Sequence, residues 1–143
     1  MATEIQVVID CADPAAVAEF WATALGYIVQ PPPDGFGSWE DFLTSIGVPE
    51  DRFNSRSAVV DPAGRGPRIF FQRVPESKSV KNRVHVDINA SDGATDDEVA
   101  RAKVDAKAQE LVAHGGSILR DFEEFGERTV VMQDPEGNEF CVQ

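Results

Sequence analysis

The sequence VVMQDPEGNEFCVQ at residues 130–143 carries the clearest structural signal in this chain. Two short apolar runs flank an Asp-Pro-Glu-Gly turn, in which proline and glycine set the backbone conformation. The second run alternates polar and apolar residues, which is typical of a strand with one buried face. The stretch therefore predicts a β-hairpin, and we expect its last strand, residues 139–142, to pair inside a sheet.

Half of this turn signal occurs earlier, because residues 59–64 read VVDPAG and precede the apolar run RIFFQ at residues 68–72. The surrounding pattern also repeats. The first copy predicts a strand at 5–11, a helix from Asp13 to Gly26 and strands at 27–30, 58–60 and 68–74. The second copy predicts a strand at 83–89, a helix at 96–113 and strands at 117–119, 129–133 and 139–142. Each half reads β-α-β-β-β at an offset of about 75 residues, which indicates a tandem duplication.

One segment of the first half, residues 34–56, has no counterpart in the second half. Within it Ser38 can cap a short helix over residues 38–47 that carries Trp39 and Phe42. The polar segment 75–82 is the predicted linker between a module of residues 1–75 and a module of residues 83–143. We expect a single α+β domain, made of two tandem βαβββ modules with mostly antiparallel sheets and helices on the outside.

Composition limits the class of protein. A chain of 143 residues with 42% hydrophobic residues is long enough for one packed domain, and no apolar run is long enough to span a membrane. The amino-terminal MATE lacks the basic and apolar character of a signal peptide, so we expect a cytoplasmic protein with Cys11 and Cys141 as free thiols. The formal charge of −12 argues against a nucleic-acid partner and permits a cationic ligand.

Strand periodicity divides each predicted strand into two faces, because successive side chains point in opposite directions. In the first strand of each half and in the last strand, one of these faces is apolar. The apolar sets are Val7, Ile9 and Cys11, then Val84, Val86 and Ile88, then Phe140 and Val142, and the opposite sets are Gln6, Val8 and Asp10, then His85, Asp87 and Asn89, then Glu139, Cys141 and Gln143. The polar face meets water if the sheets are flat, and lines a pocket if they curl into a trough.

Several short motifs, taken in order, make the chain resemble the vicinal oxygen chelate superfamily, the glyoxalase and bleomycin-resistance proteins. They are Asp13-Pro14, Phe20-Trp21 and Leu25-Gly26-Tyr27 in the first half, and His85-Val86-Asp87, Gly115-Gly116 and the stretch from Asp134 to Phe140 in the second. The inserted Trp39-Glu40-Asp41-Phe42 and the sequence FQRVPE at residues 71–76 resemble the non-classical glyoxalase-like branch. The resemblance covers nearly the whole chain. It implies paired modules that form a U-shaped sheet around a cavity, commonly in a homodimer.

The resemblance also implies a place for a metal, because metal-dependent members use His, Gln and Glu from the first and last strand of each module. The matching positions here are Gln6, His85 and Cys141, with Gln72 or else Phe70 in the first module. With Gln72, they offer one imidazole, one thiol and two amides, a poor set for a divalent ion that prefers imidazole and carboxylate. We therefore expect no cofactor. The alternative is a divalent metal held by His85, Gln6, Gln72, Cys141 or Glu139, with Asp87 as a further substitute ligand.

His85 and Asp87 share the polar face and could act as a general base and the group that orients it. A strand histidine can also be a purely structural hydrogen-bonding residue. Glu139 and Asp10 are further candidates for acid and base chemistry, although Asp10 could equally stabilise the start of the following helix. The other histidine, His114, follows the predicted helix at 96–113, where we expect an exposed capping role.

Six residues are candidates for ligand binding rather than chemistry: Gln6, Gln72, Asn89 and Cys141 on the polar faces, and Trp39 and Phe42 on the inserted helix. The two aromatic side chains could form a wall over a ligand or simply hold the short helix in place. Cys141 could be a reactive thiol if its pKa were lowered, or a small packing residue.

Our first functional hypothesis is a cytoplasmic homodimer that binds a small organic molecule in the cavity between its modules, without a classical metal centre. A cationic molecule would suit the acidic composition. The alternative is a lyase or isomerase that acts on an oxygenated small molecule through His85 and nearby carboxylates, with or without a metal. A third hypothesis is an interaction module with a closed cavity and an exposed apolar patch.

Overall fold

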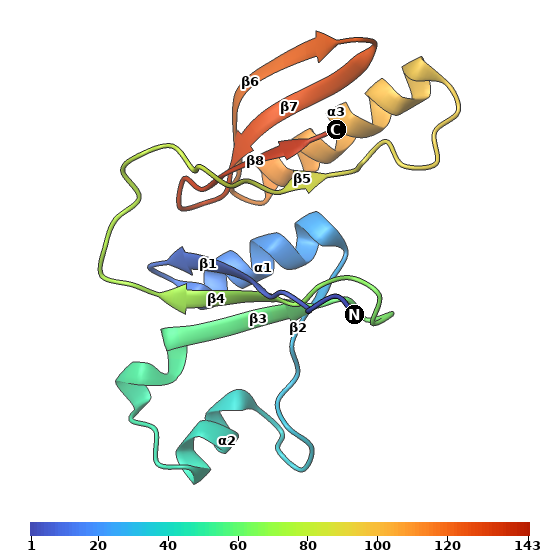
Figure 1. Ribbon diagram of the computed structural model, residues 1–143. Coiled ribbons are helices and arrows are strands. Elements are labelled where there is room, and N and C mark those ends of the chain that lie inside the picture. Colours follow the sequence, from blue (N-terminus) through green and yellow to red (C-terminus); the bar gives the residue numbers. More distant parts are fainter. The chain divides into compact units, whose positions relative to one another are not determined.

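Two four-stranded sheets organise the chain, one in each module (Figure 1). The computed structural model describes residues 1–143, and the chain divides into compact units between Ser77 and Lys78, inside the polar segment 75–82. Module 1 contains β1 (Val7–Cys11), α1 (Pro14–Leu25), β2 (Ile28–Val29), α2 (Trp39–Ser45), the 3-10 helix η1 (Glu50–Ser55), β3 (Arg56–Val60) and β4 (Ile69–Arg73). Module 2 contains β5 (Asp87–Ile88), α3 (Asp97–Ala113), β6 (Ser117–Glu124), β7 (Glu127–Gln133) and β8 (Glu139–Val142).

The two sheets have the same topology. Their strand orders are β1-β4-β3-β2 and β5-β8-β7-β6, so the first and last strand of each module are neighbours. These two strands run parallel in both sheets, and every other pair is antiparallel. The identical pairing in both halves confirms the α+β fold of two βαβββ modules with mostly antiparallel sheets. It also supports the interpretation of the repeat as a duplication.

The core of module 2 lies between α3 and one face of its sheet. The helix begins after Asp96, whose carboxylate accepts hydrogen bonds from the N–H groups of Glu98 and Val99. It buries Val104, Ala108 and Leu111, which recur at three- and four-residue intervals, and it contacts β6, β7 and β8. The sheet supplies the opposing apolar side chains, namely Ile88, Val130, Met132, Phe140 and Val142. His114 is the exposed residue at the end of this helix, as the sequence predicts.

The last hairpin forms as predicted, with β7 and β8 paired from Val130 and Val142 to Gln133 and Glu139. Its turn is held by Asp134, which is only 3% exposed and whose carboxylate accepts hydrogen bonds from Glu136 and Asn138. β8 lies between β5 and β7, so the final strand is paired on both sides.

The hairpin between β3 and β4 repeats this turn with Asp61. Its carboxylate accepts hydrogen bonds from the N–H groups of Ala63, Arg65 and Gly66. These bonds lower the pKa of Asp61, although its partial desolvation acts in the opposite direction. In both modules, therefore, an aspartate carboxylate accepts the backbone hydrogen bonds of the turn before the last strand.

In module 1 the inserted segment is tied to the start of α1. Asp13 accepts a hydrogen bond from the N–H of Ala16 and another from the side-chain amide of Asn54 in η1. Asn54 in turn accepts from the N–H of Ala15, so both residues cap the helix. Val17, Phe20 and Trp21 on α1 are buried, which confirms their assignment to the core.

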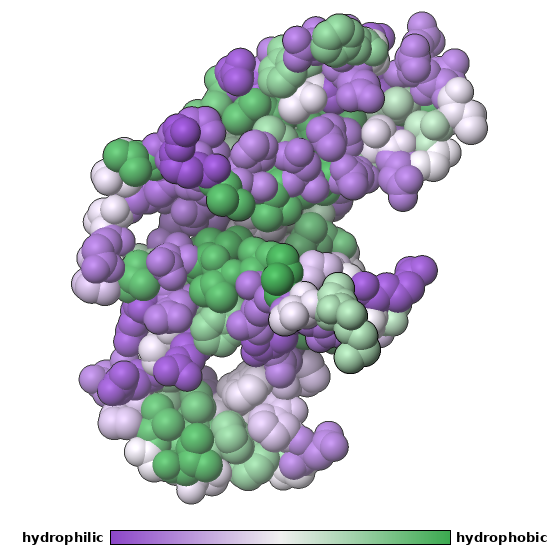
Figure 2. Space-filling model, in the orientation of Figure 1, coloured by the Kyte–Doolittle hydropathy of each residue, from purple (hydrophilic) through white to green (hydrophobic).

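The predicted short helix also forms, as α2, and Ser38 caps it by accepting from the N–H of Asp41. This helix leaves apolar side chains at the surface: Trp39 and Ile46 are exposed, as is Phe36 just before it. Figure 2 shows apolar surface gathered over the α2 region at the lower end of the view.

Several predicted boundaries were wrong. The strands predicted at 83–89 and 27–30 are reduced to Asp87–Ile88 and Ile28–Val29, because only these residues pair with β8 and β3. The strand predicted at 117–119 continues to Glu124, since it pairs with β7 through a tight turn at Phe125 and Gly126. Both turn residues have positive φ, 53° and 83°, a conformation that matches the twist of a two-residue hairpin. The 3-10 helix η1 was not predicted.

None of the helices combines the length and the apolar character that crossing a lipid bilayer would require.

Candidate functional site

Each sheet keeps one face free of its own core, and the polar residues singled out in the sequence lie on these faces. In module 2 the parallel ladder pairs Asp87 with Cys141, and Ile88 with Val142. Ile88 and Val142 are buried, whereas Asp87 is exposed and Cys141 is half-buried. The alternation predicted for these strands is therefore confirmed, and it places Asp87 and Cys141 next to each other on the outer face.

His85 joins this pair and completes a small cluster on the outer face of module 2. Its Nε2 lies 3.2 Å from Oδ1 of Asp87, and the two side chains are 44% and 41% exposed. One ligand atom from each of His85, Asp87 and Cys141 lies within 4.8 Å of the other two. An imidazole, a carboxylate and a thiol thus converge at one point, which we call the His85 cluster.

The thiol of the His85 cluster is not an activated nucleophile. Burial raises the pKa of Cys141, and the neighbouring carboxylate of Asp87 raises it further through its charge and a hydrogen bond. The positive charges of Lys81 and Arg120 act in the opposite direction but do not outweigh these effects. Cys141 is therefore held as a neutral thiol, while His85 and Asp87 have the geometry of a base and its orienting group.

Glu139 lies two residues before Cys141 in the same strand, and its carboxylate is fully engaged. It forms an ion pair with Lys78 at 3.0 Å and accepts a hydrogen bond from the N–H of Asn82, also at 3.0 Å. Burial acts to raise the pKa of Glu139, but the bonds from Asn82 and Lys78 together bring it below its ordinary value. In this arrangement Glu139 fastens the segment between the modules to the sheet of module 2.

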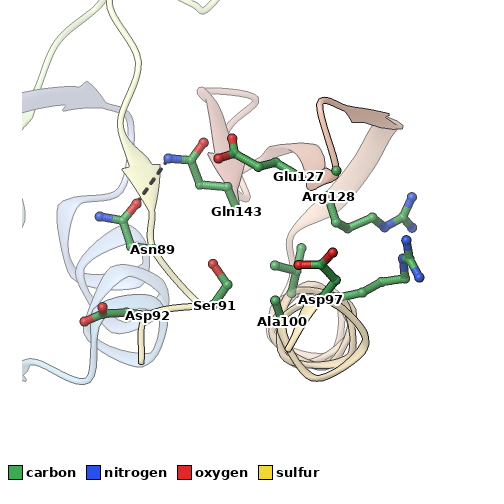
Figure 3. A pocket seen from close by; sticks show the side chains of 11 residues that line it. Asn89, Ser91, Asp92, Asp97, Ala100, Glu127, Arg128 and Gln143 are labelled. Atoms are coloured by element: carbon green, nitrogen blue, oxygen red, sulfur yellow. Dashed lines mark hydrogen bonds between the residues drawn. The ribbon is translucent and has the colours of Figure 1, made fainter. Parts of the chain in front are cut away.

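Asn89 is hydrogen-bonded to Gln143, whose Nε2 lies 3.1 Å from the Asn89 Oδ1 (Figure 3). The two amides belong to a cavity of about 320 Å³ between the start of α3 and the hairpin of β6 and β7. Its other polar lining includes Ser91, Asp97 and Glu127. Asn89 is thus the one predicted ligand-binding residue that lines this cavity, and it lies beyond the end of β5.

In module 1 the predicted residues share the outer face of the other sheet. Asp10 on β1 pairs with Gln72 on β4, and both are exposed. Gln6 lies just before β1, and its amide oxygen accepts a hydrogen bond of 2.8 Å from the guanidinium of Arg68. The same guanidinium donates to the side chain of Gln30 at 2.7 Å. The three predicted residues therefore lie on one face, together with an arginine that the sequence analysis did not include.

Trp39 and Phe42 lie on α2 of the same module. The indole Nε1 of Trp39 donates a 2.7 Å hydrogen bond to the backbone carbonyl of Gln30. The rings of Trp39 and Phe42 are 5.9 Å apart in an edge-to-face arrangement, and Phe36 packs on Phe42 in the same way at 5.2 Å. The tryptophan holds the short helix to the sheet and also remains 37% exposed, so both roles considered for it are compatible.

The His85 cluster is the one group of side chains in the protein that could hold a metal ion. His N, carboxylate O and thiolate S are all established ligands of borderline ions such as Zn²⁺, and three protein ligands leave a position open for water or substrate. Glu139, which was considered as a ligand, is instead bound to Lys78 and Asn82. A metal site in module 2 would therefore use Asp87 as its carboxylate.

Sequence reasoning missed the cations of these faces. Arg68 follows the first Asp-Pro turn, and Arg120 lies on β6, where its guanidinium stacks over Phe122 at 5.2 Å from the ring centroid. The net charge of −12 indicates an acidic protein, but it gives no information on where individual cationic side chains lie. The only sequence signal for Arg68 was its place directly before the apolar residues 69–71.

A family model described as a glyoxalase-like domain matches residues 6–143, which is nearly the whole chain. A search of curated proteins found no match.

Solved structures share the fold at low sequence identity. A possible glyoxalase from Bacillus cereus is 17% identical, with 99% of each chain covered and a TM-score of 0.61. A glyoxalase/bleomycin resistance protein/dioxygenase family enzyme from Burkholderia phytofirmans is also 17% identical, with 96% of this chain and 94% of that chain covered and a TM-score of 0.59. A mutant of the fosfomycin resistance protein FosX from Listeria monocytogenes, in complex with Mn(II) and a dihydroxypropylphosphonic acid, is 11% identical over 100% of this chain and 90% of that chain, with a TM-score of 0.61.

Proposed function

The chain belongs to the glyoxalase-like domain family, and from that premise we propose that it binds a small organic molecule on the polar faces of its sheets, without a classical metal centre. The observation that carries this proposal is the His85 cluster, in which polar side chains gather on a sheet face that the fold leaves free of its own core. Its donor set lacks a second imidazole, and Glu139, a carboxylate in the same strand as Cys141, is bound to Lys78 and Asn82.

The charge of the His85 cluster favours a ligand with a positive group. Asp87 is an exposed carboxylate that belongs to none of the Lys or Arg ion pairs, and its contacts are His85 and Cys141. An ammonium or guanidinium group could replace His85 as its partner and gain a charge-assisted hydrogen bond. The net charge of −12 would add a general attraction for cations.

A thermal-stabilisation experiment tests this proposal. The probes are guanidinium, butylammonium and benzylammonium chloride, each compared with sodium chloride at equal ionic strength. A ligand that binds only the folded protein raises Tm by mass action, so we expect at least one cation to stabilise the wild type. The shift should shrink in His85→Ala and in Asp87→Asn and stay unchanged in the control His114→Ala, which removes the other histidine. Equal shifts in all four proteins, or no shift with any cation, would contradict the proposal.

A second candidate is a lyase or isomerase that acts on an oxygenated small molecule. The 3.2 Å contact between His85 and Asp87 favours it, because an imidazole oriented by a carboxylate can accept a proton from a carbon acid. The Mn(II) in the FosX complex gives a precedent for metal within this fold, and His85, Asp87 and Cys141 could hold a divalent ion that would act as a Lewis acid. Turnover of a hemithioacetal that disappears in His85→Ala would establish this function. Binding without turnover would leave the first.

We also propose that the protein is a cytoplasmic homodimer. Homodimers are common among proteins of this fold, and a symmetric pair would bury part of the apolar surface at α2. Light scattering after size exclusion is expected to give twice the chain mass of 15.6 kDa, and a mass equal to one chain would exclude the dimer.

A further inference from the structure

The outer face of module 1 holds an arginine in a fixed position. Arg68 precedes β4, and its guanidinium spans the face: Nε donates to Gln30 Oε1 at 2.7 Å and Nη1 donates to Gln6 Oε1 at 2.8 Å. The guanidinium also lies over the ring of Phe70, with 5.2 Å between its carbon and the ring centroid. Three contacts from three different segments thus orient one half-buried cation.

The charge of Arg68 is not neutralised within the protein. Two other arginines are bound by carboxylates: Arg101 pairs with Glu123, and Arg128 pairs with Asp105 and Asp121. Arg68 belongs to none of the ion pairs, and both of its hydrogen-bond acceptors are neutral amides. In a chain with 25 acidic and 13 basic residues, a half-buried arginine without a carboxylate partner needs an explanation.

The geometry leaves donors for a ligand. A guanidinium has five N–H groups, and the two hydrogen bonds use two of them, which leaves three. Gln6 and Gln30 each accept one of these bonds through the amide oxygen. A planar fork of N–H groups fixed in this way matches the two oxygens of a carboxylate.

Trp39 is bound to one of the residues that hold Arg68, namely Gln30. The backbone oxygen of Gln30 accepts the indole N–H of Trp39, while its side-chain oxygen accepts from Arg68. Trp39 is partly exposed and packs edge-to-face with Phe42. A ligand held at Arg68 could therefore lay a flat apolar body against the indole.

We infer that Arg68, Gln6, Gln30 and Trp39 form a binding site for an aromatic carboxylate, with Arg68 as the anchor. The inference deepens the proposed small-molecule function by adding a second face and a ligand class, and it uses none of the residues of the His85 cluster. Asp10, a carboxylate on the same face, is opposite Gln72, farther along β1 than Gln6.

The test uses benzoate as the probe and benzamide as its neutral counterpart. Two-dimensional NMR of the ¹⁵N-labelled protein follows the side-chain signals of Arg68, Gln6, Gln30 and Trp39 during titration at constant ionic strength. We expect benzoate to shift these signals in a saturable way and benzamide to bind at least about tenfold more weakly, because a charge-assisted hydrogen-bond pair is lost.

Three variants distinguish a specific role of Arg68 from a general effect of positive charge. Arg68→Gln should weaken benzoate at least about tenfold, whereas Arg65→Gln, which removes an exposed guanidinium from the preceding turn, should leave benzoate affinity unchanged. Arg68→Lys keeps the charge and should bind with intermediate affinity, so it reports on the site even if Arg68→Gln folds poorly. Equal affinities for benzoate and benzamide, or equal effects of Arg65→Gln and Arg68→Gln, would overturn the inference.

The two proposals can fail separately. If cations stabilise the protein through His85 and Asp87 but benzoate shifts none of the four signals, the proposed function stands and the carboxylate site is wrong. If benzoate binds through Arg68 and no cation binds at the His85 cluster, the carboxylate site stands and the role of the cluster is wrong.

Discussion

Replacing Asp134 by alanine should test how the repeated aspartate turn holds each module together. The Asp134 carboxylate accepts hydrogen bonds from the N–H of Glu136 at 2.9 Å, from the N–H of Asn138 at 3.0 Å and from the Asn138 side chain at 3.0 Å. Because Asp134 is 3% exposed, water cannot readily replace these bonds in the variant. At about 1 kcal/mol of net stability for each bond, Asp134→Ala should lose about 3 kcal/mol.

The assay is thermal and urea unfolding followed by circular dichroism. For a chain of this size, a loss of about 3 kcal/mol corresponds to a fall in Tm of roughly 6–12 °C. Asp134→Asn keeps an oxygen for the two backbone bonds and should lose about a third as much. The control is Asp61→Ala, which removes the corresponding turn bonds of module 1 at a more exposed site and should cost less. An Asp134→Ala loss no larger than that of Asp61→Ala would refute this reasoning.

Three further predictions concern the pKa of Glu139, the pKa of Cys141 and one close contact. The folded-state pKa of Glu139 lies below its ordinary value of 4.5, so the stability that its ionised form adds is present above about pH 4.5 and is lost as the pH falls through the folded-state pKa. Glu139→Gln should therefore reduce the fall in Tm at acidic pH, and an unchanged fall would mean that other groups cause the acid sensitivity. Because the pKa of Cys141 is raised, its alkylation by iodoacetamide at pH 8, measured by mass spectrometry, should be slower than that of a free thiol and should become faster in Asp87→Asn. Fast alkylation of Cys141 in the wild type would contradict the assignment of a neutral thiol. A methyl carbon at Gly66 would lie 1.9 Å from the hydroxyl oxygen of Tyr27, so Gly66→Ala should lower Tm. Adding Tyr27→Phe should restore part of this loss, whereas an unaltered Tm in Gly66→Ala would show that the tyrosine moves aside.

Local sequence signals were sufficient to predict the elements that are bounded by turn or capping residues. β8 occupies residues 139–142 as predicted, because an Asp-Pro turn precedes it and its buried residues alternate. Helix α3 begins after Asp96, whose side chain provides a local capping signal. Where the deciding interaction lay elsewhere, prediction failed. The length of β6 depends on its pairing with β7 through Phe125 and Gly126, a turn without Pro or Asn.

The candidate site shows the same division. Alternation placed His85, Asp87 and Cys141 on one face, since the period of a strand is fixed by its backbone. The partners of these residues could not be predicted, because they come from distant segments. Glu139 is bound by Lys78, which is 61 residues away in the sequence.

The geometry of Arg68 also depends on distant residues. Gln6 is 62 residues from it and Gln30 is 38 residues from it in the sequence. No spacing rule connects these three positions. The order and register of the four strands of module 1 bring them to one face.

The metal content of the protein tests the central claim most directly, which is that this chain binds a small molecule without a classical metal centre. The protein should be purified without chelators and without a metal-affinity tag, and the wild type, His85→Ala and the control His114→Ala should be analysed by inductively coupled plasma mass spectrometry. Our account predicts metal far below one equivalent in all three proteins. About one equivalent of a divalent metal in the wild type and in His114→Ala, lost in His85→Ala, would contradict it and favour the lyase or isomerase function.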